Sequence, residues 1–374
     1  MGSFDDLIKK ASKEWKAPDM MDGAKKKRGA KLPFSSPLMN WATYGGIPRD
    51  KITEFCGNPG GGKSTTAIDI CKNAVEIFKQ EHQDRMVELR EHGTTADQKI
   101  ELAELEENGP RRVLYIDLEH SFDLDWANKL GIDDAEIDLM QPPDIPAEAL
   151  LNMIIEAVQT NELGLIVLDS IPSLVPQAVL DKKLGERTVS ALAGLLTTFL
   201  IKLVPLLTRH KTTFLMINQV RDNMDNPYVI HTPGGNAVKF YCSLRLMFTV
   251  GNPIDLMGNE LPMKTEDPAG YVIKVKSLKQ KSAPWDRKVA SYYLLSDSGI
   301  KPALDYAQLA INKYGIIKKA GGWFTLADPD TGEILENDQG MPVKIQGMPK
   351  VYDYLENNLE YYTKLKNFIE NDIN

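Results

Sequence analysis

Cysteine is scarce in this sequence, and its spacing builds no framework. The 374 residues include three cysteines, Cys56, Cys71 and Cys242, each within an apolar stretch and none in a C-x-x-C pattern. Structural zinc sites and disulfide scaffolds both need clustered cysteines. The sequence therefore supports neither.

Long apolar runs, a signal-like N-terminus and an excess of positive charge are also missing. No apolar run approaches the roughly 18 to 20 residues that span a bilayer, and the segment from Met1 to Lys16 is charged. We therefore expect a cytoplasmic protein without membrane partners. The net charge of -8 argues against a surface coated with nucleic acid on every side, although one groove or loop can still be basic.

The sequence patterns divide the chain into three predicted parts. Residues 1–34 form an N-terminal helix and basic linker, residues 35–298 a large core, and residues 299–374 a small α+β module. In the first part Phe4, Leu7, Ile8, Ala11 and Trp15 recur on one helical face. A helix this short is marginal alone, so this face packs either on its own core or on a neighbouring copy.

Within the core, apolar runs alternate with helical patterns, which predicts an α/β fold with a mostly parallel sheet. A charged, helix-prone insertion at 79–108, with a break near Gly93, interrupts this alternation. We interpret the insertion as solvent-exposed, with partner binding as the alternative. The strand candidates are Ile52 to Cys56, Val113 to Asp117, Leu165 to Asp169, Thr212 to Asn218, Leu244 to Val250 and Tyr271 to Ser277.

The third part begins with a predicted helix from Pro302 to Tyr314. A hairpin follows, from Gly322 to Leu335 through a turn at 328–332, because aspartate, proline and glycine gather there. One final helix is expected to end near Asn371.

The clearest motif is a complete G-x-x-x-x-G-K-[ST] loop between a strand pattern and a helical pattern. Its glycines allow backbone N–H groups to face phosphates at a helix N-terminus. Lys63 can reach the β- and γ-phosphates, and the Ser64 hydroxyl can ligate Mg2+. The loop therefore predicts ATP and Mg2+ as ligands, against the alternative of a glycine-rich turn that binds nothing. Its residues are Gly57, Asn58, Pro59, Gly60, Gly61, Gly62, Lys63, Ser64 and Thr65.

Three further strands end in polar side chains at the expected carboxyl edge of the sheet. Asp169 is a candidate for holding Mg2+, and Glu119 for activating the attacking water. Gln219 can bond the γ-phosphate while joined to the long loop at 220–237, so nucleotide binding could order that loop. The alternative is that these residues have no role in the site: Asp169 would end its strand by chance, and Glu119 would be an ordinary surface acid.

These motifs together resemble the bacterial RecA recombinase family, from about Ser35 to Trp323. The resemblance rests on the phosphate loop, Tyr115 to His120, Val167 to Ser170, Ile217 to Arg221 and above all Gly234 to Tyr241. It implies a RecA-like P-loop ATPase core that forms a filament on single-stranded DNA. Such a filament hydrolyses ATP and exchanges strands with homologous double-stranded DNA.

The family's site residues carry over to positions of this chain. Lys63, Ser64 and Asp169 match the nucleotide and Mg2+ ligands, Glu119 the catalytic glutamate and Gln219 the γ-phosphate sensor. Asp123 and Trp126 fall at the adenine contacts, although Trp126 alone reads as a core residue. Lys279 and Lys281 match lysines that reach the γ-phosphate from the neighbouring subunit.

The family's DNA loops correspond to 181–189 and 220–237, and its N-terminal oligomerisation helix to residues 3–15. The implied DNA contacts are Arg187, Arg221, Tyr228, Gly234, Gly235 and Asn236. Gly194 and Ile201 stand where the family has DNA-facing arginines, so Arg187 and Lys202 are possible substitutes. These departures and the insertion indicate a divergent member, for which a phage origin is one interpretation.

Two other functions remain open from the sequence. One is a ring-shaped motor of the same superfamily, such as a helicase or clock-type ATPase. The other is a DNA-coating scaffold that only binds nucleotide. The motif at 234–241 and the paired lysines favour the recombinase, and no arginine-rich lid segment supports a small-molecule kinase.

Overall fold

The computed structural model describes residues 29–183, 191–220 and 231–373, together with Asp6, Lys10, Lys13 and Glu14. The chain divides into two compact units, residues 1–30 and 31–374. The four described positions before residue 29 are helical and exposed. The rest of the predicted N-terminal helix and most of the basic linker lie outside the described residues. So do three predicted DNA contacts, Arg187, Arg221 and Tyr228.

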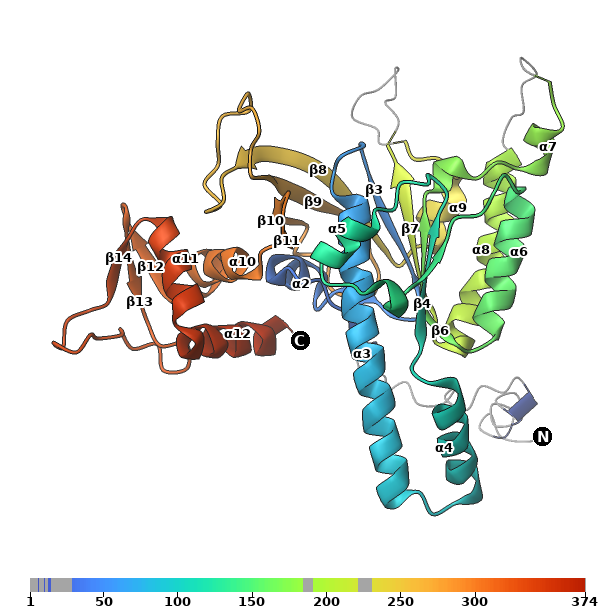
Figure 1. The fold of residues 1–374 in the computed structure, drawn as a ribbon, viewed down its shortest axis with the longest axis horizontal. Helices are drawn as coiled ribbons and strands as arrows, with labels where there is room; N and C mark the ends of the chain where they lie inside the picture. The colour runs from blue at the N-terminus through green and yellow to red at the C-terminus, as the bar shows by residue number, and fades with distance from the viewer. Residues whose placement is uncertain are drawn as a thin grey trace. The chain divides into compact units, whose positions relative to one another are not determined.

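The second unit is built on a nine-stranded sheet in the order β11-β10-β9-β8-β3-β7-β6-β4-β5 (Figure 1). The strands from β8 to β5 pair in parallel, whereas β9, β10 and β11 pair antiparallel. All six predicted strands are present, so the α/β class with a mostly parallel sheet is confirmed. The strands are Ile52–Gly57 (β3), Arg112–Asp117 (β4), Asp138–Met140 (β5), Leu163–Asp169 (β6), Thr213–Gln219 (β7), Leu244–Ile254 (β8), Gly270–Gln280 (β9), Val289–Leu295 (β10) and Gly299–Ile300 (β11).

Helices cover both faces of this sheet. Strands β3 and β6 are buried along their whole length, which explains the nearly continuous apolar run of β6, whereas β3 carries the buried polar residues Thr53 and Glu54. One face packs against α3, and the other packs against α6 and α8. The helices of the core are Pro37–Thr43 (α2), Lys63–His92 (α3), Ala96–Asn108 (α4), Leu124–Lys129 (α5), Ala147–Gln159 (α6), Gln177–Leu180 (α7), Ala191–His210 (α8) and Gly235–Tyr241 (α9), with short turns at Asp134–Glu136 (η3) and Ile171–Ser173 (η4), and a separate pair of strands at Lys31–Leu32 (β1) and Ile47–Pro48 (β2).

Helix α8 corrects one statement made from the sequence. It is the single helix in the described ranges that is long and apolar enough to cross a membrane, by length and composition alone. The expectation that no apolar run approaches that length was therefore wrong. Leu196, Phe199 and Leu203 bury one side of α8 in the core beneath the sheet, so we interpret it as a core helix.

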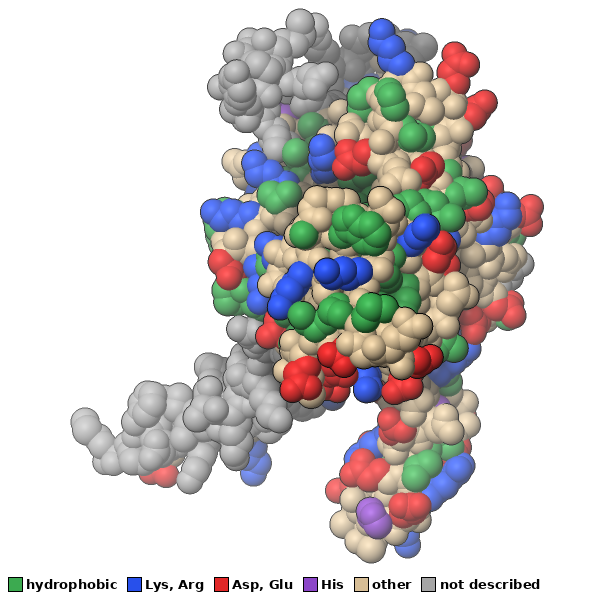
Figure 2. Space-filling model, turned by 90° about the vertical axis from the view of Figure 1, so that its left-hand side faces the viewer, with side chains coloured by type: hydrophobic (Ala, Val, Ile, Leu, Met, Phe, Trp, Pro, Cys, Tyr) green, Lys and Arg blue, Asp and Glu red, His purple; other side chains and the backbone are tan. Residues whose placement is uncertain are grey.

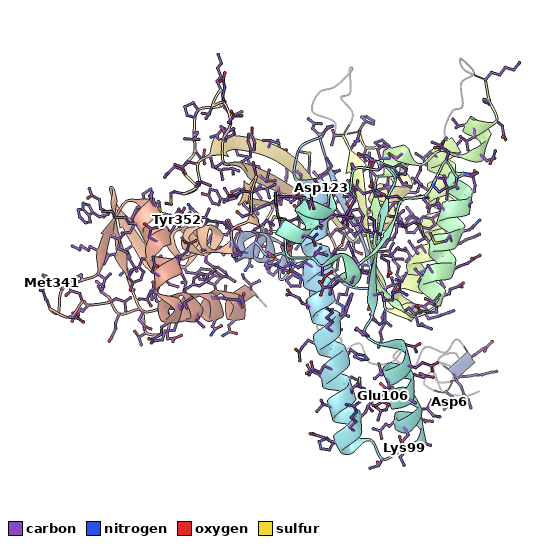
Figure 3. The ribbon with its side chains drawn as sticks, viewed as in Figure 1. Asp6, Lys99, Glu106, Asp123, Met341 and Tyr352 are labelled. Atoms are coloured by element: carbon purple, nitrogen blue, oxygen red, sulfur yellow. The ribbon has the colours of Figure 1, made fainter. Side chains whose placement is uncertain are left out.

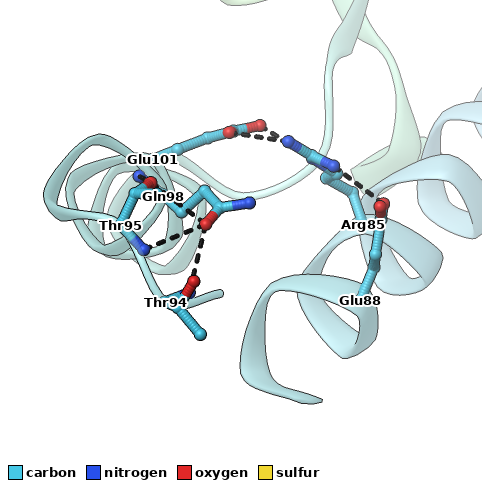
Figure 4. A network of polar contacts seen from close by, with 6 residues as sticks. All are labelled: Arg85, Glu88, Thr94, Thr95, Gln98 and Glu101. Atoms are coloured by element: carbon cyan, nitrogen blue, oxygen red, sulfur yellow. Dashed lines mark hydrogen bonds and ion pairs between the residues drawn. The ribbon is translucent and has the colours of Figure 1, made fainter. Parts of the chain in front are cut away.

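The predicted insertion is a helical hairpin. Its first half continues the phosphate-loop helix without a break, because α3 runs for 30 residues. The predicted break is real: Thr95 caps α4 through a reciprocal bond pair with Gln98 (Figure 4). Arg85 bridges the two helices by pairing with Glu101 on α4, and it also pairs with Glu88 on its own helix (Figure 4). Charged side chains cover the exposed end of the hairpin, which is typical of a solvated face (Figure 2).

The C-terminal module forms its own apolar core around a three-stranded sheet. Around the predicted turn, Asp328 N–H donates to Glu333 O at 2.8 Å and Ala327 forms an isolated bridge with Ile334. The predicted hairpin is otherwise wrong, because the strand at Trp323–Leu326 pairs with Ile317–Ala320 and Lys344–Gln346. The predicted final helix is instead two helices, because the Asn358 side chain accepts from Tyr361 N at 3.1 Å and starts a new helix. The elements are Pro302–Leu309 (α10), Ala310–Tyr314 (η5), Ile317–Ala320 (β12), Trp323–Leu326 (β13), Lys344–Gln346 (β14), Met348–Asn357 (α11) and Leu359–Ile373 (α12).

Candidate functional site

The phosphate loop joins the carboxyl end of β3 to the N-terminus of α3. Gly57 must be glycine, because a Cβ there would lie 2.3 Å from the backbone oxygen of Phe248 on the neighbouring strand. Gly62 caps α3 in the left-handed conformation, with a φ of 78°. The sequence thus folds into a turn that presents backbone N–H groups at a helix start, which suits an anionic ligand.

Lys63 and Ser64 follow directly, on the first turn of α3. Lys63 Nζ donates to Asn58 O at 2.8 Å, so the ammonium group lies across the loop. Burial lowers the pKa of Lys63, although Asp169 and Glu119 nearby oppose that shift. Ser64 Oγ donates to Asp169 Oδ2 at 2.7 Å. A hydroxyl and a carboxylate meet here, and this hard oxygen donor set suits Mg2+.

Asp169 ends β6 and is buried. Burial raises the pKa of its carboxyl, and hydrogen bonds from Ser64 and Tyr115 partly oppose this shift. The Tyr115 hydroxyl also donates to Oδ2, at 2.7 Å. The sequence placed Tyr115 in a family motif but assigned it no role, because a tyrosine in an apolar strand looks like an ordinary core residue.

Glu119 lies just beyond β4, next to the ends of β6 and β7. Its Oε1 accepts from Ser170 Oγ and from Gln219 Nε2, the latter at 3.3 Å. The Asp117 side chain holds the Glu119 backbone in place by accepting from Glu119 N at 3.1 Å. Three predicted site residues, Glu119, Asp169 and Gln219, therefore meet at one sheet edge. Ser170 is a fourth residue that the sequence did not single out.

Asp123, labelled in Figure 3, is the N-cap of α5, and Trp126 lies on that helix. The Asp123 side chain caps the helix by accepting from Trp126 N at 3.0 Å. Trp126 is half-buried and packs against the larger core cluster. Both residues thus have a structural role in this chain, and the ring keeps an accessible part that a base could contact.

The two described ends of the second predicted DNA loop are held together by buried polar groups. Asn218, just before the loop, donates to Pro233 O in the last part of the loop at 3.0 Å, and to Glu54 Oε1 at 2.8 Å. Glu54 is fully buried and pairs through its other oxygen with Arg245 Nε. A buried carboxylate thus joins the base of the loop to the start of β8. The sequence did not predict this contact, because the three residues are far apart along the chain.

The predicted loop at 220–237 ends earlier than expected, because α9 begins at Gly235, and packing explains the glycine at 234. Gly234 caps α9 at a φ of 96°, and a Cβ there would lie 2.8 Å from Val238 and 2.9 Å from Leu196. Asn236 is exposed on the first turn of α9. On α8, Gly194 has open space around it and Ile201 is exposed, so neither arginine of the family pattern has a replacement at its own position.

Lys279 and Lys281 lie at the opposite, amino edge of the sheet. Strand β9 is antiparallel to β8, so Gln280 is opposite Leu244, which in turn pairs with Thr53 at the start of β3. Lys279 Nζ donates to Phe240 O at 2.7 Å, and Lys281 Nζ donates to the same oxygen at 3.2 Å. Both ammonium groups lie over the Phe240 ring, which is 66% exposed. We call Phe240, Lys279 and Lys281 the amino-edge patch.

The structure does not bring this patch to the phosphate loop of the same chain. Strand β3 separates the two along its length, roughly 13 Å from Thr53 to Gly57 at the usual rise per residue. Burial, together with the neighbouring Lys281 charge, lowers the pKa of Lys279 to about 8. In one chain the patch is thus a second, separate cationic surface.

Comparisons with known proteins agree with these features. A family model described as the RecA N-terminal domain matches residues 83–301. Protein RecA of Thermus aquaticus is 31% identical over 328 residues, which cover 86% of this chain and 79% of that protein. Protein RecA of Bacteroides thetaiotaomicron is 30% identical over 330 residues, covering 87% and 85%. Protein RecA of Chlorobaculum tepidum is 32% identical over 295 residues, covering 78% and 72%.

Proposed function

Because this chain belongs to the RecA family, we propose that it is an ATP-dependent recombinase. It would assemble on single-stranded DNA, search for homology and exchange strands with double-stranded DNA. The observation that carries this proposal is the convergence of Ser64, Asp169, Glu119 and Gln219 at one sheet edge beside the phosphate loop. A scaffold that only bound nucleotide would not need Glu119 there, and the comparisons do not favour a ring-shaped motor.

The carboxyl edge supplies the groups that hydrolysis needs. Residues 57–65 would bind the phosphates, with Lys63 neutralising the β- and γ-phosphates. Ser64 and Asp169 would hold Mg2+, which neutralises charge that develops during phosphoryl transfer. Glu119 would take the proton of the water that attacks the γ-phosphorus, releasing ADP and inorganic phosphate. Asp123 and Trp126 would contact the adenine.

Gln219 would link hydrolysis to DNA binding. It bonds Glu119 in this structure and directly precedes the loop at 220–237. A γ-phosphate would compete with Glu119 for the Gln219 amide, and the buried Asn218–Glu54 contact would pass that shift to the far end of the loop. DNA contacts would come from Arg187, Arg221, Tyr228, Gly234, Gly235 and Asn236.

The amino-edge patch would complete the nucleotide site of the next subunit. Lys279 and Lys281 bond only backbone oxygens within the described chain, and neither reaches the phosphate loop of its own sheet. A head-to-tail contact would place them against the γ-phosphate of a neighbour, and such contacts build helical filaments. The N-terminal helix would dock on the same neighbour.

The remaining expectations stand within this proposal. The chain would work in the cytoplasm and consist of the N-terminal segment 1–34, the core 35–298 and the module 299–374. Its departures from the family pattern at Gly194 and Ile201, and the hairpin α3–α4, would mark a divergent member of phage origin.

A strand-exchange assay tests the proposal. Single-stranded DNA would be paired with homologous or heterologous duplex, with and without ATP, using Lys63→Ala protein as the control. We expect product only with homologous duplex, ATP and the unmodified chain. Pairing that ignores homology or ATP would reject the recombinase assignment.

A further inference from the structure

Tyr115 places a hydroxyl inside the apolar core beside the nucleotide site. Its side chain is 1% exposed, and its ring packs edge-on against Phe122 with the ring centroids 4.8 Å apart. The hydroxyl reaches from β4 to the end of the adjacent strand β6, where it donates to Asp169 Oδ2 at 2.7 Å. A buried hydroxyl without a partner would destabilise the fold, so this hydroxyl needs its acceptor. Packing alone would be served equally well by phenylalanine.

The hydrogen bonds to Asp169 are asymmetric. Oδ2 accepts from Tyr115 and from Ser64, each at 2.7 Å. Within the ranges that the structure describes, no donor bonds to Oδ1. Two donors on one oxygen restrict rotation of the carboxylate and leave the other oxygen available to a ligand. This is how hydrogen bonds behind a metal ligand fix its orientation.

We propose that Tyr115 is a positioning residue that orients Asp169 toward the Mg2+ of the bound nucleotide. The inference rests on the proposed nucleotide site. Ser64 would itself ligate the metal through the oxygen that donates to Asp169, so this hydrogen bond depends on the ligand. Tyr115 bonds Asp169 from the core, because its ring is buried on the face of the sheet that packs against α3. Tyr115 itself touches neither the nucleotide nor the metal in this account.

The test is Tyr115→Phe, which removes the hydroxyl and keeps the ring. The Mg2+ dependence of nucleotide affinity would be measured without DNA, using a fluorescent non-hydrolysable ATP analogue. We expect the Mg2+ concentration for half-maximal binding to rise about tenfold, as is usual when a hydrogen bond behind a metal ligand is lost. Affinity for the analogue without Mg2+ should stay unchanged.

Tyr361→Phe is the matched control. Tyr361 is also buried, and its hydroxyl donates to Ala327 O at 3.0 Å in the C-terminal module, far along the chain from the loop. Both variants lose one buried hydrogen bond, so both should lower the unfolding temperature by a similar amount. Only Tyr115→Phe should change the Mg2+ dependence.

Two results would overturn the inference. The first is a Tyr115→Phe protein with the Mg2+ dependence of the unmodified chain and the stability of Tyr361→Phe, because the hydroxyl would then be purely structural. The second is an equal Mg2+ shift on adding Tyr115→Phe to Asp169→Asn, since a residue that acts through Asp169 has no effect in its absence.

If the unmodified chain binds no nucleotide with Mg2+, the proposed site and this inference both fail. If the chain binds it but Tyr115→Phe changes nothing, only the inference fails.

Discussion

The two edges of the central sheet are built in different ways. At the carboxyl edge, Asp169 and Glu119 receive hydrogen bonds from side chains on neighbouring elements, and Asp169 is buried whereas Glu119 is exposed. At the amino edge, the partners of Lys279 and Lys281 among the described residues are backbone oxygens of α9, and both lysines lie over an exposed ring. One edge is organised within a single chain, and the other presents cations to its surroundings.

This difference supports the proposal that each nucleotide site is shared between two subunits. Binding groups at the carboxyl edge need no partner to hold them in place. Cations at the amino edge carry no carboxylate partner in the described parts of the chain, and the sheet itself separates them from their own phosphate loop. The phosphates of a nucleotide bound to a neighbouring copy would provide anions to pair with these lysines. Variants at each edge separately test whether the two edges have these different roles.

The largest effect is expected at the carboxyl edge. Lys63→Ala removes the cation that crosses the phosphate loop, so ATP hydrolysis should fall by about a thousandfold or more. Nucleotide affinity without DNA should fall with it, because binding at this edge involves one chain. Steady-state phosphate release and a fluorescent nucleotide titration would measure both. Hydrolysis near the normal rate would remove Lys63 from the site.

Glu119→Gln should lower turnover by roughly a hundredfold or more while preserving nucleotide binding. The amide keeps the size of the carboxylate but cannot accept the proton of the attacking water. Electron microscopy with ATP and single-stranded DNA should show filaments that persist long after those of the unmodified chain disassemble. Normal hydrolysis by this variant would contradict the assigned role.

The buried pair between the two edges should matter for stability. Glu54→Gln leaves Arg245 buried without its counter-charge, which usually lowers the free energy of unfolding by about 3 kcal/mol or more. Glu88→Gln breaks an exposed pair with Arg85 in the hairpin and should lower it by less than about 1 kcal/mol. Urea unfolding followed by circular dichroism would compare them. Equal losses would mean that the buried Glu54–Arg245 pair stabilises the fold no more than an exposed pair does.

The smallest effect is a pH dependence at the amino edge. The pKa of Lys279 is lowered to about 8, so the side chain is charged below that pH and becomes neutral above it. A neighbour's phosphates would favour the charged form and raise this pKa, so assembly takes up a proton and weakens as pH rises above about 8. Light scattering at about pH 7 and about pH 9 should show a few-fold loss of ATP-dependent assembly. Lys279→Ala should show a smaller loss over the same interval.

The sequence predicted most of the carboxyl edge. The phosphate loop and the polar strand ends at Asp169, Glu119 and Gln219 are local signals, because a few adjacent residues determine a strand, a turn and a helix start. The bonds from Tyr115 and Ser170 were not predictable, because they depend on the register of strands that lie far apart in the sequence. The continuous helix α3 was missed because its charged second half lacks the apolar face that normally identifies a packed helix.

The position of Lys279 was the least accessible from the sequence. Its strand was predicted, but the edge at which that strand ends depends on whether β9 runs parallel or antiparallel to β8. The connection at 255–269 is long enough for either arrangement, so only the assembled sheet shows which edge results. The separation of the two edges, on which the proposed division of the site rests, is therefore a property of the topology.

A mixing experiment tests the divided site most directly. Lys63→Ala subunits keep their amino-edge patch, and subunits with both Lys279→Ala and Lys281→Ala keep their phosphate loop. Each protein alone should hydrolyse ATP poorly on single-stranded DNA. Mixed in equal amounts, the two should recover up to about a quarter of normal activity, because random head-to-tail contacts combine an intact loop with an intact patch at that frequency. Activity no higher than the mean of the two separate proteins would contradict a site shared between subunits.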